Sequence, residues 1–98
     1  MKRRYKLNPQ ARYDLLSIWE LIGRDNIRAA DRQAERMEAA FRLLARFPKT
    51  GHERADVETS EPVLFRPVGS YRVACRPEPR PVIILRILHG ARDLDALF

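Results

Sequence analysis

The sequence contains a single cysteine, Cys75, so no disulfide bond can form within the chain. Small secreted domains commonly depend on disulfides, whereas a lone thiol is typical of a reducing cytoplasm. Long apolar runs are also missing, and none approaches the roughly 20 residues that a membrane-spanning helix needs. The basic segment 1–5 is not followed by the apolar core of a signal peptide. We therefore expect a cytoplasmic protein with no membrane segment.

Residues that bind metals or transfer protons are scarce. The two histidines, His52 and His89, lie far from each other and from Cys75 in the sequence, so the ligand spacing of a zinc site is absent. Cys75 falls inside an extended run, where a buried small side chain is expected rather than a nucleophile. His52 falls in a polar segment, where a solvated side chain is expected. We therefore predict no metal and no cofactor.

Positive charge is what the sequence has in excess. Lysine and arginine total 19 against 13 acidic residues, which gives a formal net charge of +6. A basic surface suits a polyanion such as a nucleic acid, an acidic protein or an anionic membrane, although an ordinary soluble surface is the alternative on charge alone. The length is that of one small domain, so we expect residues 1–98 to form a single domain that a tight partner would stabilise.

The N-terminal segment predicts a short strand and then a helix. Tyr5 and Leu7 alternate with charged residues, which is the period of a strand with one buried face. Asn8 and Pro9 then supply a helix N-cap and a favoured first helical residue, and apolar residues recur at helical spacing after them. Gly23 is expected to end this helix in the left-handed conformation.

A second helix is expected to begin after Asn26 and to end at Phe47, followed by a polar loop over residues 48–61. Because the connection between the two helices is short, they should form an antiparallel hairpin, with Trp19 and Met37 near the shared seam. The aromatic and methionine side chains of this stripe are interpreted as core residues.

The second half of the chain predicts three strands, over residues 62–67, 71–76 and 82–88. The run 82–88 is apolar except for Arg86, as in a strand that is buried on both faces, so it should be central in the sheet. Residues 91–98 are expected to form a final helical turn. Strand ends are expected at four prolines: Pro62, Pro67, Pro77 and Pro81. The order β-α-α-β-β-β predicts an α+β two-layer domain, with the helical hairpin on an antiparallel or mixed sheet of about four strands.

Four basic residues in the last two strands and after them are the candidate target-binding residues: Arg72, Arg86, His89 and Arg92. Arg86 interrupts an apolar strand, so it needs either a solvent-facing groove or an acidic partner. The possible partners are Asp14, Glu20, Asp93 and Asp95. His89 has two interpretations as well, a proton-transfer residue or a strand-end side chain that bonds backbone or solvent.

The order of elements, together with several motifs, resembles the RelE/ParE toxin superfamily over nearly the whole chain. The motifs are Leu-Asn-Pro-Gln-Ala at 7–11, Phe-Pro-Lys-Thr-Gly at 47–51, Gly-Ser-Tyr-Arg-Val at 69–73 and Leu-His-Gly-Ala-Arg-Asp-Leu at 88–94. The likeness is greater to the ParE branch. It implies a small cytoplasmic toxin of a type II toxin–antitoxin pair that a cognate, ParD-like antitoxin neutralises. ParE-like toxins poison DNA gyrase, and RelE-like toxins cleave mRNA on the ribosome.

The resemblance also allows the two activities to be compared. The nuclease branch uses two lysines, an arginine and a terminal tyrosine or histidine, and the matching positions here fall near Val63 and Phe65, on Arg72 and near Phe98. Only Arg72 matches, and a guanidinium cannot run acid–base chemistry because its pKa is too high. We therefore predict a gyrase-inhibiting toxin. The alternatives are a RelE-like endoribonuclease that uses Arg72 and His89, and a degenerate member that only binds its antitoxin.

An antitoxin partner is expected under all three interpretations. The predicted binding site is a groove between the helical hairpin and the sheet, where an antitoxin segment would bury apolar side chains and place its acids against the arginines.

Overall fold

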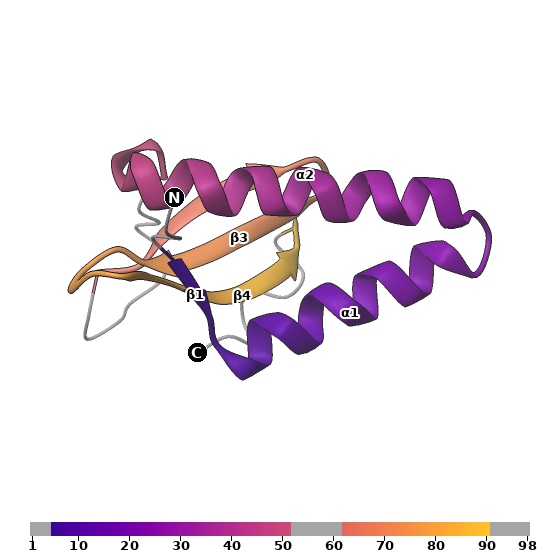
Figure 1. The fold of residues 1–98 in the computed structure, drawn as a ribbon, viewed down its shortest axis with the longest axis horizontal. Coiled ribbons are helices and arrows are strands. Elements are labelled where there is room, and N and C mark those ends of the chain that lie inside the picture. Colours follow the sequence, from indigo (N-terminus) through magenta and orange to yellow (C-terminus); the bar gives the residue numbers. More distant parts are fainter. Residues whose placement is uncertain (1–4, 52–61, 91–98) are drawn as a thin grey trace.

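The computed structural model describes residues 5–51 and 62–90, which fold into two layers (Figure 1). The elements in chain order are β1 (Tyr5–Leu7), α1 (Pro9–Gly23), α2 (Ile27–Arg46), the short 3-10 helix η1 (Pro48–Thr50), β2 (Leu64–Val68), β3 (Tyr71–Arg76) and β4 (Val82–His89). The four strands form one sheet in the order β1-β4-β3-β2, in which β1 is parallel to β4 and the other neighbours are antiparallel. The predicted α+β fold with its β-α-α-β-β-β order is confirmed.

Side-chain caps fix the starts of both helices. Asn8 Oδ1 accepts a hydrogen bond from the Ala11 amide at 2.9 Å, and Asn26 Oδ1 accepts one from the Ala29 amide at 3.0 Å. The expected role of Gly23 is wrong, because it is the last residue of α1 and positive φ angles occur only at Gly69 and Gly90 among the described residues.

The main core lies between the helices and the sheet. Met37 and Phe41 of α2 are fully buried there with Val73 and Ile84 of the sheet, as the helical periodicity predicts. Trp19 differs from a core residue, since it is only partly buried and its Nε1 donates to Asp31 Oδ1 at 2.9 Å. That bond still ties α1 to α2 near the turn of the hairpin, which extends beyond the sheet (Figure 1).

The sheet also has a buried cluster on the face opposite the helices. Phe65, Ala74 and Leu88 form it, whereas Ile84 and Ile87 of β4 belong to the helix-side core. β4 lies between β1 and β3 and contributes to both clusters, so the prediction of a central strand that is buried on both faces is confirmed.

Several predicted boundaries change. Pro67 lies inside β2 rather than at its end, which is possible because β2 is an edge strand and its outer side needs no amide. β4 continues through His89, one residue beyond the expected end. The predicted turn over 91–98 and the predicted solvation of His52 concern residues outside those that the structure describes. None of the described helices is long and apolar enough to cross a membrane.

Candidate functional site

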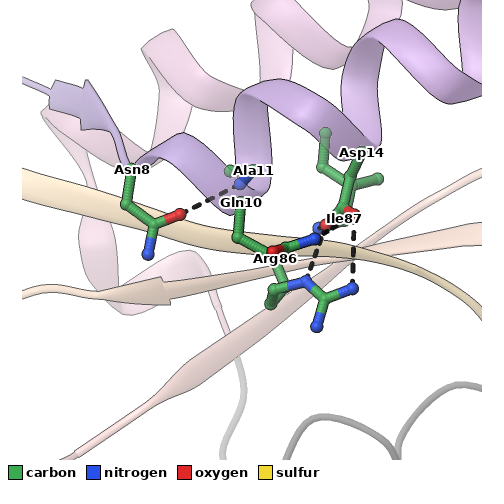
Figure 2. A network of polar contacts seen from close by, with 6 residues as sticks. All are labelled: Asn8, Gln10, Ala11, Asp14, Arg86 and Ile87. Carbon is green, nitrogen blue, oxygen red and sulfur yellow. Dashed lines mark hydrogen bonds and ion pairs between the residues drawn. The ribbon is translucent and has the colours of Figure 1, made fainter.

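A carboxylate of α1 binds the outer edge of β4 (Figure 2). Asp14 Oδ2 accepts hydrogen bonds from Arg86 Nε at 2.8 Å and from the Ile87 backbone amide at 2.9 Å. Asp14 Oδ1 accepts a second bond from Arg86 Nη2 at 3.2 Å, and Gln10 Nε2 lies 3.4 Å from the same oxygen. The bidentate geometry fixes both the charge and the orientation of the guanidinium.

The short length of β1 explains why this carboxylate is needed. β1 pairs only with residues Val82, Ile83 and Ile84, so no strand of the described residues lies on the outer side of the second half of β4. A buried backbone amide without a partner is costly, and Asp14 supplies the acceptor that a longer β1 would have provided at Ile87.

Of the two interpretations of Arg86, the structure shows the acidic partner, and it is Asp14. The side chain of Asp14 is only 9% exposed and that of Arg86 is 25% exposed. Removing one member of such a pair leaves the other charge poorly solvated, so the pair holds α1 against the sheet. Any target that binds Arg86 has to compete with this carboxylate.

Beside the ion pair lies a shallow groove of about 210 Å³, which we call the α1–β4 groove. Its lining includes Tyr13, Ser17, Leu21, Tyr71, Arg86 and His89. Tyr13 and Leu21 are 65% and 58% exposed, so two apolar side chains of α1 stand open to solvent at its margin. His89 packs edge-on against Tyr71, with 5.2 Å between the ring centroids. The groove thus combines apolar walls with two basic residues.

Arg72 lies on the other face of the sheet. It is opposite Leu88 and Pro67 in the strand register, and Leu88 belongs to the cluster that faces away from the helices. Its Nε atom is buried and has no hydrogen-bond partner within the described part of the chain. A buried donor without an acceptor is uncommon in folded proteins, so Arg72 differs in this respect from most buried polar groups.

The structure therefore separates the four candidate residues. His89 pairs with Tyr71 on the helix face of the sheet, and Arg72 projects from the opposite face. Arg86 leaves β4 on the same face as Arg72, opposite Ala74, and its guanidinium reaches Asp14 at the edge of β4, where it borders the α1–β4 groove. Arg92 lies outside the described residues. Adjacent residues of a strand point to opposite faces, so Tyr71 and Arg72 cannot share a site. Tyr71 and Arg72 are adjacent in the sequence, but their side chains lie on opposite faces of the sheet.

Two residues of the groove were missed in the sequence. Tyr13 and Leu21 are eight positions apart, which is close to two helical turns, and they flank the stripe that packs into the core. Apolar residues at this spacing beside the core stripe were the available signal, because they widen the apolar side of α1 beyond what the hairpin buries.

Other chemistry has little support among the described residues. They contain no group of three histidine, cysteine or acidic side chains that could hold a metal ion. Burial among apolar side chains raises the pKa of the Cys75 thiol to about 11. The thiol is therefore protonated and unreactive near neutral pH, and the prediction of a buried small side chain is confirmed.

Comparisons with known proteins agree with this fold. Residues 5–94 match the family model described as the ParE toxin of the type II toxin–antitoxin system parDE. The chain is 32% identical over 84 residues to Toxin ParE3 of Caulobacter vibrioides, which covers 85% of this chain and 82% of that protein. A solved structure titled as the chromosomal ParDE TA system from P. aeruginosa superposes with a TM-score of 0.73 at 18% identity, covering 90% of this chain and 96% of that one. The chain belongs to the ParE toxin family of type II toxin–antitoxin systems.

Proposed function

We propose that this toxin acts in the cytoplasm by binding DNA gyrase, and that a cognate antitoxin neutralises it. The observation that carries the proposal is the separation of Arg72 from His89 by the sheet, because it argues against a nuclease and in favour of a binding poison. Arg72, His89 and Arg92 are the proposed contacts with the target, and Arg86 joins them only where the target displaces or extends the Asp14 pair.

RNA cleavage through the 2′-hydroxyl needs a base, an acid and cations that converge on one phosphate. Next to Arg72 on its face of the sheet, Phe65 is buried, and Val63 packs against the same cluster. Neither side chain can transfer a proton. His89 lies across the sheet from the Arg72 guanidinium, so the pair that the nuclease alternative requires does not converge on one phosphate.

The antitoxin is proposed to occupy the α1–β4 groove. An amphipathic helix or strand that covers Tyr13 and Leu21 would bury the exposed apolar surface of α1, and an acidic side chain would reach His89 and Arg86. This occupant would also cover the proposed target contacts on that face, which gives neutralisation a direct steric cause.

A supercoiling assay with purified gyrase tests the target. The toxin should inhibit supercoiling and increase linear, gyrase-cleaved DNA, and Arg72→Ala should weaken the effect. Arg42→Ala is the matched control, because Arg42 is exposed on α2 and lines neither the groove nor the Arg72 face. Unaffected gyrase at saturating toxin would exclude gyrase as the target.

Inducing the chain alone in cells separates the remaining alternatives. A gyrase poison should trigger a DNA-damage response before translation stops, whereas mRNA cleavage would appear first as arrested translation. Normal growth with confirmed expression would instead identify a degenerate member. Co-expression with a cognate antitoxin should restore growth, and Leu21→Glu should abolish that rescue if the antitoxin lies in the groove.

A further inference from the structure

A second and larger cavity lies at the other end of the helices, where α2 ends. Its volume is about 610 Å³, which is within the usual range for ligand sites. None of its lining residues belongs to the α1–β4 groove. It is formed where η1 and the loop between β3 and β4 meet, and we call it the η1 cavity.

The walls of the η1 cavity are apolar. Phe47, Leu64 and Pro77 contribute to them from three separate segments of the chain. Phe47 is a large aromatic residue, and it is 53% exposed. An exposed aromatic side chain at the margin of a concave apolar surface is typical of a protein contact site.

Hydrogen bonds hold both walls in place without a ligand. Arg80 Nη1, from the β3–β4 loop, donates to the Ala45 carbonyl oxygen in the last turn of α2 at 2.9 Å. On the η1 side, Thr50 Oγ1 donates to the Phe47 carbonyl oxygen at 2.9 Å. Gly51 packs so closely against β2 that an added Cβ would lie 2.9 Å from the Leu64 Cβ. The cavity is therefore preformed, which lowers the entropic cost of binding.

The charges around the cavity are mostly positive. Arg46, Lys49 and Arg80 line it, and Glu78 is the one acidic residue in its lining. The Arg46 guanidinium lies 5.5 Å from the centre of the Phe47 ring, so a cation stands directly beside the exposed aromatic surface. An occupant that places an apolar group on the walls and carboxylates near the margin would satisfy both features.

We propose that the η1 cavity binds an extended acidic segment of a partner protein, with one large apolar side chain inserted beside Phe47. A peptide suits this site better than a nucleic acid, because the walls offer a single aromatic ring for stacking and the margin includes the carboxylate of Glu78. The η1 cavity is separate from the groove proposed for the antitoxin. The proposal for this cavity does not depend on whether gyrase is the target of the toxin.

Nuclear magnetic resonance titration of the isotopically labelled chain tests the site. The probe is the end-capped hexapeptide Asp-Glu-Leu-Phe-Glu-Asp, added up to millimolar concentration. Amide shifts should concentrate at Phe47, Lys49 and Glu78. The neutral analogue Asn-Gln-Leu-Phe-Gln-Asn and the truncated analogue Asp-Glu-Ala-Ala-Glu-Asp should each bind about fivefold or more weakly. Rising salt concentration should weaken the binding of the acidic peptide and leave the binding of the neutral analogue unchanged.

Two double variants with the same change in charge locate the interaction. Arg46→Gln with Lys49→Gln should weaken binding about fivefold or more, because two cations at the cavity are lost. Arg28→Gln with Arg42→Gln removes two exposed arginines of α2 outside the cavity and should leave binding unchanged. Thermal unfolding of both variants establishes that the fold is retained.

Four results would overturn the proposal: no shifts at millimolar peptide, shifts at other residues, equal binding of the neutral peptide, or equal weakening by both double variants. Tighter binding of a single-stranded oligonucleotide at the same amides would also overturn it. So would concentration-dependent shifts of Phe47 in the free chain that vanish on dilution, because they would identify a second copy of the chain as the occupant.

Discussion

Arg72 and Arg86 lie on adjacent strands within apolar surroundings, and they differ in whether a described acidic residue accepts hydrogen bonds from the guanidinium. Arg86 has a carboxylate from α1 in bidentate contact, whereas the Nε of Arg72 is buried with no acceptor among the described residues. The first arginine joins two layers of the fold, and the second lies on a face that no described helix covers. The comparison suggests that a cation on an apolar strand serves the fold when a helix supplies its partner, and is available for binding when none does.

The largest effect should come from removing the carboxylate. Asp14→Ala leaves the Ile87 amide and the Arg86 guanidinium without their acceptor, and we expect a loss of about 3 kcal/mol or more in the free energy of unfolding. Chemical denaturation measures it, and Glu35→Ala is the control, because Glu35 is an exposed acidic residue of α2. A loss below about 1 kcal/mol, the range of surface pairs, would mean that Asp14 does not link the layers.

Removing the Arg86 guanidinium should lower the free energy of unfolding by less than removing the Asp14 carboxylate does. Arg86→Met leaves Asp14 with the Ile87 amide as a remaining donor, so we expect a loss of about 2 kcal/mol. The double variant Asp14→Ala with Arg86→Met should be more stable than the sum of the single losses predicts, because the two residues interact directly. Strict additivity would show that the contact contributes little.

Arg72 should behave in the opposite way. Arg72→Met removes a buried donor that has no acceptor among the described residues, so stability should stay within about 0.5 kcal/mol of the native chain or rise. Inhibition of gyrase should weaken in the same variant. A large loss of stability with unchanged inhibition would reverse the assignment and make Arg72 the structural residue.

The smallest expected effect is the pH dependence linked to the Cys75 thiol, which should be absent near neutral pH. Its pKa is raised from 9.0 to about 11 in the folded chain, so the folded state holds the thiol proton more tightly than the unfolded state. The stability linked to this proton is complete below pH 9 and falls as the pH rises from about 9 towards 11. The stability difference between the native chain and Cys75→Ala should narrow over that range. Rapid alkylation of the native thiol at pH 8 would contradict this burial.

The fold was largely predictable from local patterns. The Asn8 and Asn26 caps, the helical stripe that buries Met37 and the apolar run of β4 each depend on residues close together in sequence. The predictions for Gly23 and Pro67 were wrong for different reasons. Gly23 keeps the helical backbone conformation as the last residue of α1, so it does not use the left-handed region that glycine allows. Pro67 is tolerated within β2 because β2 is at the edge of the sheet.

The site was less predictable, because it depends on which residues meet across the two layers. Asp14 was one of four possible partners for Arg86, and only the placement of α1 along the uncovered edge of β4 selects it. The separation of Arg72 from His89 follows from the strand register, which the sequence does not specify to one residue.

The brevity of β1 has a consequence for self-association. Within residues 5–51 and 62–90, no strand pairs with the outer edge of β4 beyond Ile84, and unpaired edges of this kind promote aggregation through strand pairing between molecules. The Asp14 carboxylate already holds the Ile87 amide, and it places a desolvated negative charge where an incoming backbone carbonyl would have to sit. The same contact that fastens α1 to the sheet therefore protects the molecule against intermolecular strand pairing.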